Sequence, residues 1–179
     1  MDIVPLLRAY CPCNEEQEAV RGKFFDFIRT NPDCLLRSCV PGHLTGSAFV
    51  VDSSGGKVLL VHHRKLGKWL QPGGHADGDS DLQRVAAREV SEETGLSGLR
   101  PLLNGVFDLD IHTIPARPGE PEHLHYDVRF LFDADAGMPL LVSHESHSLC
   151  WIKLQDVPSL SSEESILRMV RKASLPGRG

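Results

Sequence analysis

The sequence lacks any apolar run that approaches the ~18 residues a membrane-spanning helix needs. Its first residues, MDIVPLLRAY, carry an acid at position 2 and no long apolar core, so we expect no signal peptide, no membrane partner and a cytoplasmic location. Internal repeats and low-complexity segments are missing as well. A chain of 179 residues with these features is expected to fold as one domain, with or without a short extension.

An excess of positive charge is also missing. The formal net charge is −5, from 24 acidic residues against 19 lysines and arginines. We therefore expect no nucleic acid partner, although a local basic cluster can still bind phosphate groups. Hydrophobic residues make up 41% of the chain, which is enough to build a core.

Cysteines are few and odd in number. The chain has five of them, and an odd count without a secretory signal favours free thiols in a reducing compartment. Two close pairs, Cys11 with Cys13 and Cys34 with Cys39, lack the two-residue spacing of a zinc knuckle. We therefore favour free thiols over a structural zinc site.

Helical periodicity is present near both ends and in the middle of the chain. It predicts amphipathic helices over residues 14–29 and 162–173, the first capped by Asn14. A further helix is expected to begin near Ser80 or Asp81, and Ser80 with Gln83 fits a capping box.

Apolar and alternating runs predict a set of strands. The first two flank a Ser-Ser-Gly-Gly turn and are expected to form a hairpin, and segment 64–79, rich in Gly, Pro and charge, is expected to be a loop. The predicted strands cover residues 43–52, 57–63, 105–114, 125–133 and 147–153. Strands interspersed with helices predict a layered α/β or α+β domain.

The stretch REVSEETG, residues 88–95, places three carboxylates on one helical face. Glu89, Glu92 and Glu93 stand at i, i+3 and i+4, where like charges repel. One interpretation is a solvated acidic face of an interaction module. The other is a divalent cation site, which the preceding Gly73-Gly74 pair and the basic run HHRK favour, because a polyphosphate would need all three features.

Residues 73–96, GGHADGDSDLQRVAAREVSEETGL, resemble the Nudix box. That pattern is a glycine, five residues, a glutamate, seven residues and then Arg-Glu-apolar-x-Glu-Glu-x-Gly-apolar. Gly74 matches the first glycine, and residues 88–96 match the second half at the correct spacing. Ser80 stands where the family usually has its first glutamate. The resemblance covers roughly residues 44–173.

The resemblance implies a fold and an activity. The fold would be α/β, a Nudix α/β/α sandwich with a mixed sheet between helices, spanning residues 41–179 behind an N-terminal helical extension at residues 1–40. The activity would be metal-dependent hydrolysis of a phosphoanhydride bond in a nucleoside diphosphate linked to another moiety. A small nucleotide-like diphosphate is thus the expected partner, and a homodimer is one state that the fold commonly adopts.

The resemblance also implies roles for single residues. Glu89, Glu92 and Glu93 would coordinate Mg²⁺ or Mn²⁺, and Arg88 would hold a glutamate carboxylate in place. The catalytic base would be a box glutamate, or an acid from a distant loop, for which Glu145 is the candidate.

Several other residues are expected to contact the substrate. Polar stripes on strands 105–114 and 125–133 would face water in a half-exposed sheet, but under a helix layer they must line a pocket or be paired. The substrate-binding candidates are Arg64, Lys68, Gly73, Gly74, His75, His112, His125 and Asp127. Two alternatives on the same fold stay open, a non-hydrolytic nucleotide-metabolite sensor and a prenyl-diphosphate isomerase-like protein.

Overall fold

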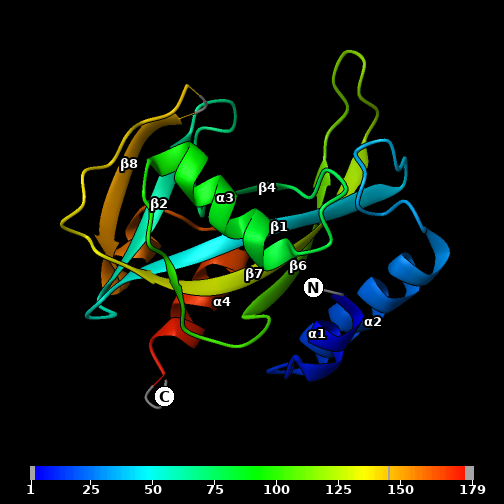
Figure 1. Cartoon of the computed structure of the whole chain (residues 1–179), viewed down its shortest axis with the longest axis horizontal. Helices are drawn as coiled ribbons and strands as arrows, with labels where there is room; N and C mark the ends of the chain where they lie inside the picture. Colours follow the sequence, from blue (N-terminus) through cyan, green and yellow to red (C-terminus); the bar gives the residue numbers. More distant parts are fainter. Residues whose placement is uncertain (1–2, 145, 176–179) are drawn as a thin grey trace. The chain divides into compact units, whose positions relative to one another are not determined.

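The structure is a computed structural model that describes residues 3–144 and 146–175 (Figure 1). The chain divides into two compact units. The first consists of Met1–Ser47, Gly73–Ala86 and Gly105–Phe130, and the second of Ala48–Pro72, Ala87–Asn104 and Leu131–Gly179. Within the described residues, none of the helices is both long enough and apolar enough to cross a membrane.

The described helices and strands can be followed along the chain in Figure 1. The helices are α1 (Ile3–Ala9), α2 (Glu15–Thr30), α3 (Leu82–Thr94) and α4 (Glu164–Ala173), with a 3-10 helix, η1 (Leu154–Ser159). The strands are β1 (Gly42–Asp52), β2 (Lys57–His63), β3 (Lys68–Leu70), β4 (Gly73–His75), β5 (Arg100–Pro101), β6 (Asp108–Ile114), β7 (His123–Ala134) and β8 (Ser146–Lys153). The strand order is β3-β2-β1-β7-β5, while β4 pairs with β1, β6 with β7 and β8 with β2.

Helix α2 forms where the sequence predicts it and has the predicted N-cap residue. The Asn14 side chain accepts a hydrogen bond of 2.8 Å from the backbone N–H of Gln17, which caps the helix. The helix packs through two aromatic rings on Tyr126 of β7. Phe27 stacks on this ring at a centroid distance of 3.8 Å, and Phe24 meets it edge-on at 5.3 Å. The cap and these contacts anchor the N-terminal region within the first unit.

The predicted hairpin is confirmed in the second unit. Strands β1 and β2 are antiparallel, with Val51 opposite Val58. The Asp52 carboxylate accepts hydrogen bonds from Lys57 N at 2.7 Å and from Ser54 Oγ at 2.6 Å, which fixes the turn. Strand β8 then pairs along the whole length of β2. The remaining predicted strands and the last helix are confirmed within three residues at each end.

The prediction of a loop over residues 64–79 is wrong in part, because this segment contains β3 and β4. Gly73 lies opposite Ser47 of β1, and a β carbon at Gly73 would lie 2.2 Å from Ser47 Oγ. Glycine is therefore needed for the two strands to approach, not to make a turn. Glycine is depleted in strands, so the glycine-rich sequence of this segment favours a loop.

The predicted cap of α3 is wrong by one residue. Asp81 Oδ1 accepts a hydrogen bond of 3.1 Å from the backbone N–H of Arg84, and the helix begins at Leu82. Ser80 is exposed. Aspartate is as good an N-cap as serine. Because the helix starts at Leu82, the Leu82 side chain reaches the core, where it is 1% exposed.

Candidate functional site

The three box glutamates project from α3 in the second unit. Arg88 lies between two of them, since its Nη2 donates to Glu89 Oε1 at 2.8 Å and its Nε lies 3.6 Å from Glu92 Oε1. Glu89 is 16% exposed and Glu92 is 61% exposed. The guanidinium offsets part of the repulsion between carboxylates and holds the more buried one in place. The donor set, three hard carboxylate groups, suits Mg²⁺ or Mn²⁺.

The N-terminal end of α3 has its own polar contacts in the first unit. The Asp79 carboxylate receives two hydrogen bonds from the Arg84 guanidinium, at 2.7 and 3.0 Å, and one from Asp81 N at 2.8 Å. Asp79 and Asp81 therefore organise the start of the helix at the place where the family usually has a glutamate. The helix also packs closely on β1, because a β carbon at Gly46 would lie 2.6 Å from Leu82 O.

The predicted glycine pair and His75 form β4. Gly74 lies opposite Gly46, and His75 lies opposite Thr45 of β1. Burial and the charges of Arg37 and His43 lower the pKa of His75 to about 4. With this pKa, the His75 ring carries no positive charge near pH 7.

Arg129 and three aspartates form a buried network where the two polar stripes meet. The register places Asp108 opposite Arg129 and Asp110 opposite Asp127. The Arg129 guanidinium reaches Asp127 at 2.7 Å, Asp110 at 3.1 Å and Asp108 at 3.5 Å. Burial alone would lower the pKa of Arg129, but these carboxylates raise it above its ordinary value. The stripes are thus paired with each other.

Asp127, a predicted substrate contact, uses both carboxylate oxygens inside the protein. Its Oδ1 accepts hydrogen bonds from Thr45 Oγ1 at 2.9 Å and Ser47 Oγ at 2.7 Å, and its Oδ2 accepts from Arg129 Nε. At 2% exposed, this carboxylate joins β1 to β7. Its surroundings favour a structural contribution over direct contact with a substrate.

The other histidines predicted to bind substrate lie in a group of five that the sequence did not reveal as a whole. The rings of His43, His75, His112, His123 and His125 approach one another at centroid distances of 4.8–5.4 Å in the first unit. His112 Nδ1 lies 3.1 Å from Asp110 Oδ2, which joins this histidine cluster to the charged network. His43 and His123 were missed, because only the pairing of distant strands brings them to the others.

The predicted basic residues have protein partners in the second unit. Arg64 donates to the Ser146 carbonyl at 3.0 Å, and Lys68 forms an ion pair of 2.7 Å with Glu163. The Lys68 side chain is 53% exposed, so a phosphate can compete for its ammonium group. Glu145, the candidate base, lies outside the described residues.

Comparison with known proteins identifies relatives of the chain. A family model described as NUDIX domain matches residues 42–172. The uncharacterized Nudix hydrolase YvcI of Bacillus subtilis is 31% identical over 106 residues, which cover 58% of this chain and 63% of that protein. Nucleoside diphosphate-linked moiety X motif 6 of Xenopus laevis is 40% identical over 65 residues, which cover 33% of this chain and 30% of that protein. The chain thus spans less than two thirds of the length of these relatives.

A solved structure supports the same grouping at the level of the fold. The C. elegans Ap4A hydrolase in a binary complex aligns with a TM-score of 0.60 at 19% identity, over 73% of this chain and 94% of that one. This likeness confirms the expected α/β/α sandwich.

Proposed function

Because the chain belongs to the Nudix family, we propose that it hydrolyses a phosphoanhydride bond in a nucleoside diphosphate linked to another moiety. The observation that carries the proposal is the intact acidic face of α3, where Arg88 holds Glu89 beside two further glutamates. A protein that only sensed nucleotides would not need three carboxylates kept together against their mutual repulsion. The proposal places the protein among cytoplasmic enzymes.

Glu89, Glu92 and Glu93 would hold Mg²⁺ or Mn²⁺, which when bound supplies a Lewis acid and an activated water. Their fit to the ion rests on donor chemistry, since carboxylate oxygens are the ligands that hard cations prefer. Arg88 holds the Glu89 carboxylate in its orientation through the 2.8 Å contact. The base would be a box glutamate, with Glu145 as the alternative.

Phosphate contacts are proposed for Arg64 and Lys68. A phosphate would replace Glu163 as the partner of Lys68, at little cost because the pair is exposed. In the first unit, Gly73, Gly74, His75, His112 and His125 stay candidates for contact with the remainder of the substrate. The class that the C. elegans neighbour is named for, a dinucleoside polyphosphate, belongs to the substrates worth testing first.

We also propose a division of the chain. Residues 1–40 would form the helical extension and residues 41–179 the catalytic domain, which agrees with a family match that begins at residue 42. A homodimer is proposed as the assembly. Size-exclusion chromatography with light scattering tests the assembly directly.

The test is a screen of nucleoside-diphosphate derivatives for release of mononucleotide or phosphate with Mg²⁺ or Mn²⁺. We expect turnover of at least one derivative, lowered by more than about 100-fold in Glu92→Gln and Glu93→Gln, since each removes a cation ligand. Glu16→Gln, an exposed change on α2, is the matched control and should keep wild-type activity. Full activity in both box variants would overturn the proposal.

A further inference from the structure

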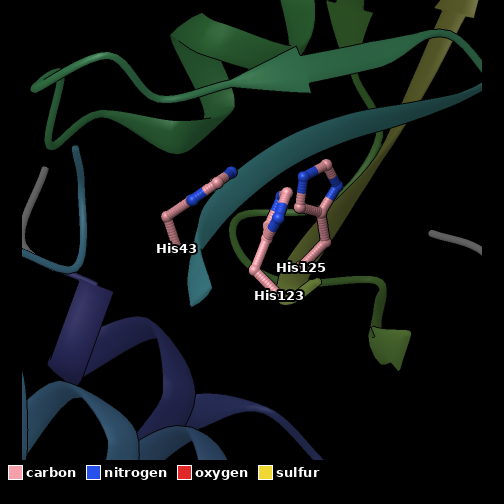
Figure 2. A group of neighbouring side chains, drawn as sticks. All are labelled: His43, His123 and His125. Atoms are coloured by element: carbon pink, nitrogen blue, oxygen red, sulfur yellow. The ribbon is translucent and has the colours of Figure 1, made fainter. Parts of the chain in front are cut away.

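Three members of the histidine cluster have the arrangement of a metal centre. His43 lies at the start of β1, and His123 and His125 lie at the start of β7 (Figure 2). One ring nitrogen from each lies within 4.8 Å of those from the other two. His43 is 2% exposed, His123 is 7% exposed and His125 is half-buried. The three rings therefore converge away from bulk water.

Four of the six ring nitrogens in this triad are buried without a hydrogen-bond partner. They are both ring nitrogens of His43, Nε2 of His123 and Nε2 of His125. A buried polar atom without a hydrogen-bond partner destabilises the fold. Four such atoms in three adjacent rings are unfavourable if the histidines only fill space, because apolar side chains could fill the same space without unsatisfied polar atoms. Ligation satisfies the lone pairs that packing leaves unused.

The hydrogen bond of His123 fixes which of its nitrogens can act as a ligand. Its Nδ1 lies 2.9 Å from the Pro121 carbonyl oxygen, which can only accept, so Nδ1 carries the proton. Nε2 then holds a free lone pair, the arrangement usual for metal-binding histidines. Neutral imidazole is the form that binds metals.

A carboxylate stands beside the triad. Glu120 Oε1 lies 3.8 Å from His123 Nε2, and the Glu120 side chain is 49% exposed. Its backbone is fixed by two hydrogen bonds with Arg117, at 2.8 and 2.9 Å. The side chain can thus swing to a cation while its backbone stays in place.

We propose that His43, His123 and His125 bind a divalent transition metal of the zinc class, with Glu120 as the fourth ligand. Tetrahedral ligands at a Zn–N distance of about 2.1 Å lie about 3.4 Å apart, so side-chain rotations that close the triad by about 1.4 Å suffice. Nitrogen donors select zinc-class ions over Mg²⁺. The site is therefore chemically distinct from the acidic face of α3, and it goes beyond the proposed hydrolysis. A bound ion would join the first residues of β1 and β7 to the loop that carries Glu120.

The test measures metal uptake by untagged, chelator-treated protein. Calorimetry with Zn²⁺ should show one tight equivalent per chain, and Co²⁺ should give the visible absorption of a tetrahedral site, which Zn²⁺ then abolishes. His43→Gln, His123→Gln and His125→Gln should each weaken Zn²⁺ binding at least as much as the roughly 10–100-fold that loss of an outer-shell partner costs. Each variant is checked for folding by circular dichroism.

Two matched controls separate this site from others. His147→Gln changes an exposed histidine of the second unit, whose ring centroid lies 5.4 Å from that of His62. Glu92→Gln changes the acidic face of α3. Both should keep tight Zn²⁺ binding. In the wild-type protein, Zn²⁺ should also shift the side-chain ¹⁵N resonances of the triad and leave that of His147 in place, a measurement that does not depend on how the variants fold. Unchanged triad resonances, or uptake lost in Glu92→Gln but kept in the triad variants, would overturn the proposal.

Discussion

Arg129 and Asp127 lie on the same face of β7 and are joined by a hydrogen bond of 2.7 Å between Nε and Oδ2, where their side chains are only 3% and 2% exposed. Through this pair, two strands that alternate polar and apolar residues bury their polar faces. Asp127 then continues the connection to Thr45 and Ser47 of β1. The charged stripes thus hold strands together and need not line a pocket.

Replacement of Arg129, the positive charge at the centre of this network, should strongly lower the free energy of unfolding. Arg129→Met leaves three aspartates without their shared partner, and breaking a buried ion pair from one side costs about 3–5 kcal/mol. Urea unfolding should show a loss of that size in the free energy of unfolding. Arg29→Met is the control, because the Arg29–Asp26 pair is exposed and is worth at most about 1 kcal/mol. Equal losses in the two variants would contradict the network.

The N-cap of α3 predicts different losses of stability for substitutions at the neighbouring residues Ser80 and Asp81. Asp81→Ala should lower the free energy of unfolding by about 1 kcal/mol, because the hydrogen bond to Arg84 N is lost. Ser80→Ala should change it by less than about 0.5 kcal/mol, since Ser80 is exposed. Thermal unfolding of both variants measures the difference. A larger loss in Ser80→Ala would restore serine as the cap.

Gly73 tests the close approach of β4 to β1. Gly73→Ala should lower the free energy of unfolding by more than about 2 kcal/mol, because the new β carbon meets Ser47 Oγ at 2.2 Å and Ser47 Cα at 2.8 Å. The control is Gly22→Ala on α2, where a β carbon has nothing within 4 Å. That variant should gain about 0.5–1 kcal/mol, because alanine favours a helix interior. A tolerated Gly73→Ala would show that the strands lie further apart.

The β1–β2 turn should contribute a pH-dependent part of stability. Burial would raise the pKa of Asp52, but hydrogen bonds from Ser54 and from Lys57 N lower it below its ordinary value. Because the folded-state pKa is the lower one, Asp52 stabilises the fold above its unfolded pKa of about 3.9 and this stabilisation is lost as pH falls. Asp52→Asn should therefore lose less stability than wild type on acidification below about pH 4. Parallel acid titrations of unfolding check the slope.

Local signals predicted the elements that depend on local contacts. Asn14 caps α2 by a bond to a residue three positions on, and the hairpin closes through Asp52 and its neighbours. Helix α1 was missed, because it has seven residues with Pro5 among them. Strand β4 was missed, because the close approach of Gly73 to Ser47 of β1 leaves no signal in the local sequence.

The histidine triad could not be predicted for a related reason. His43 lies about 80 residues from His123 and His125 in the sequence, and no spacing rule connects residues so far apart. The acidic face of α3 was predictable, because its three members fall within one helical turn and a half. The two groups thus differ in how far apart in the sequence their members lie.

Calorimetric titration of chelator-treated protein with Mg²⁺ tests the central claim most directly, because imidazole ligands bind this ion poorly. The account predicts Mg²⁺ binding by the wild-type protein, accompanied by a rise in the thermal midpoint. The combined variant Glu89→Gln, Glu92→Gln, Glu93→Gln should show neither effect, while Glu16→Gln should show both. Undiminished Mg²⁺ binding by the combined variant would contradict the assignment of the acidic face as the cation site.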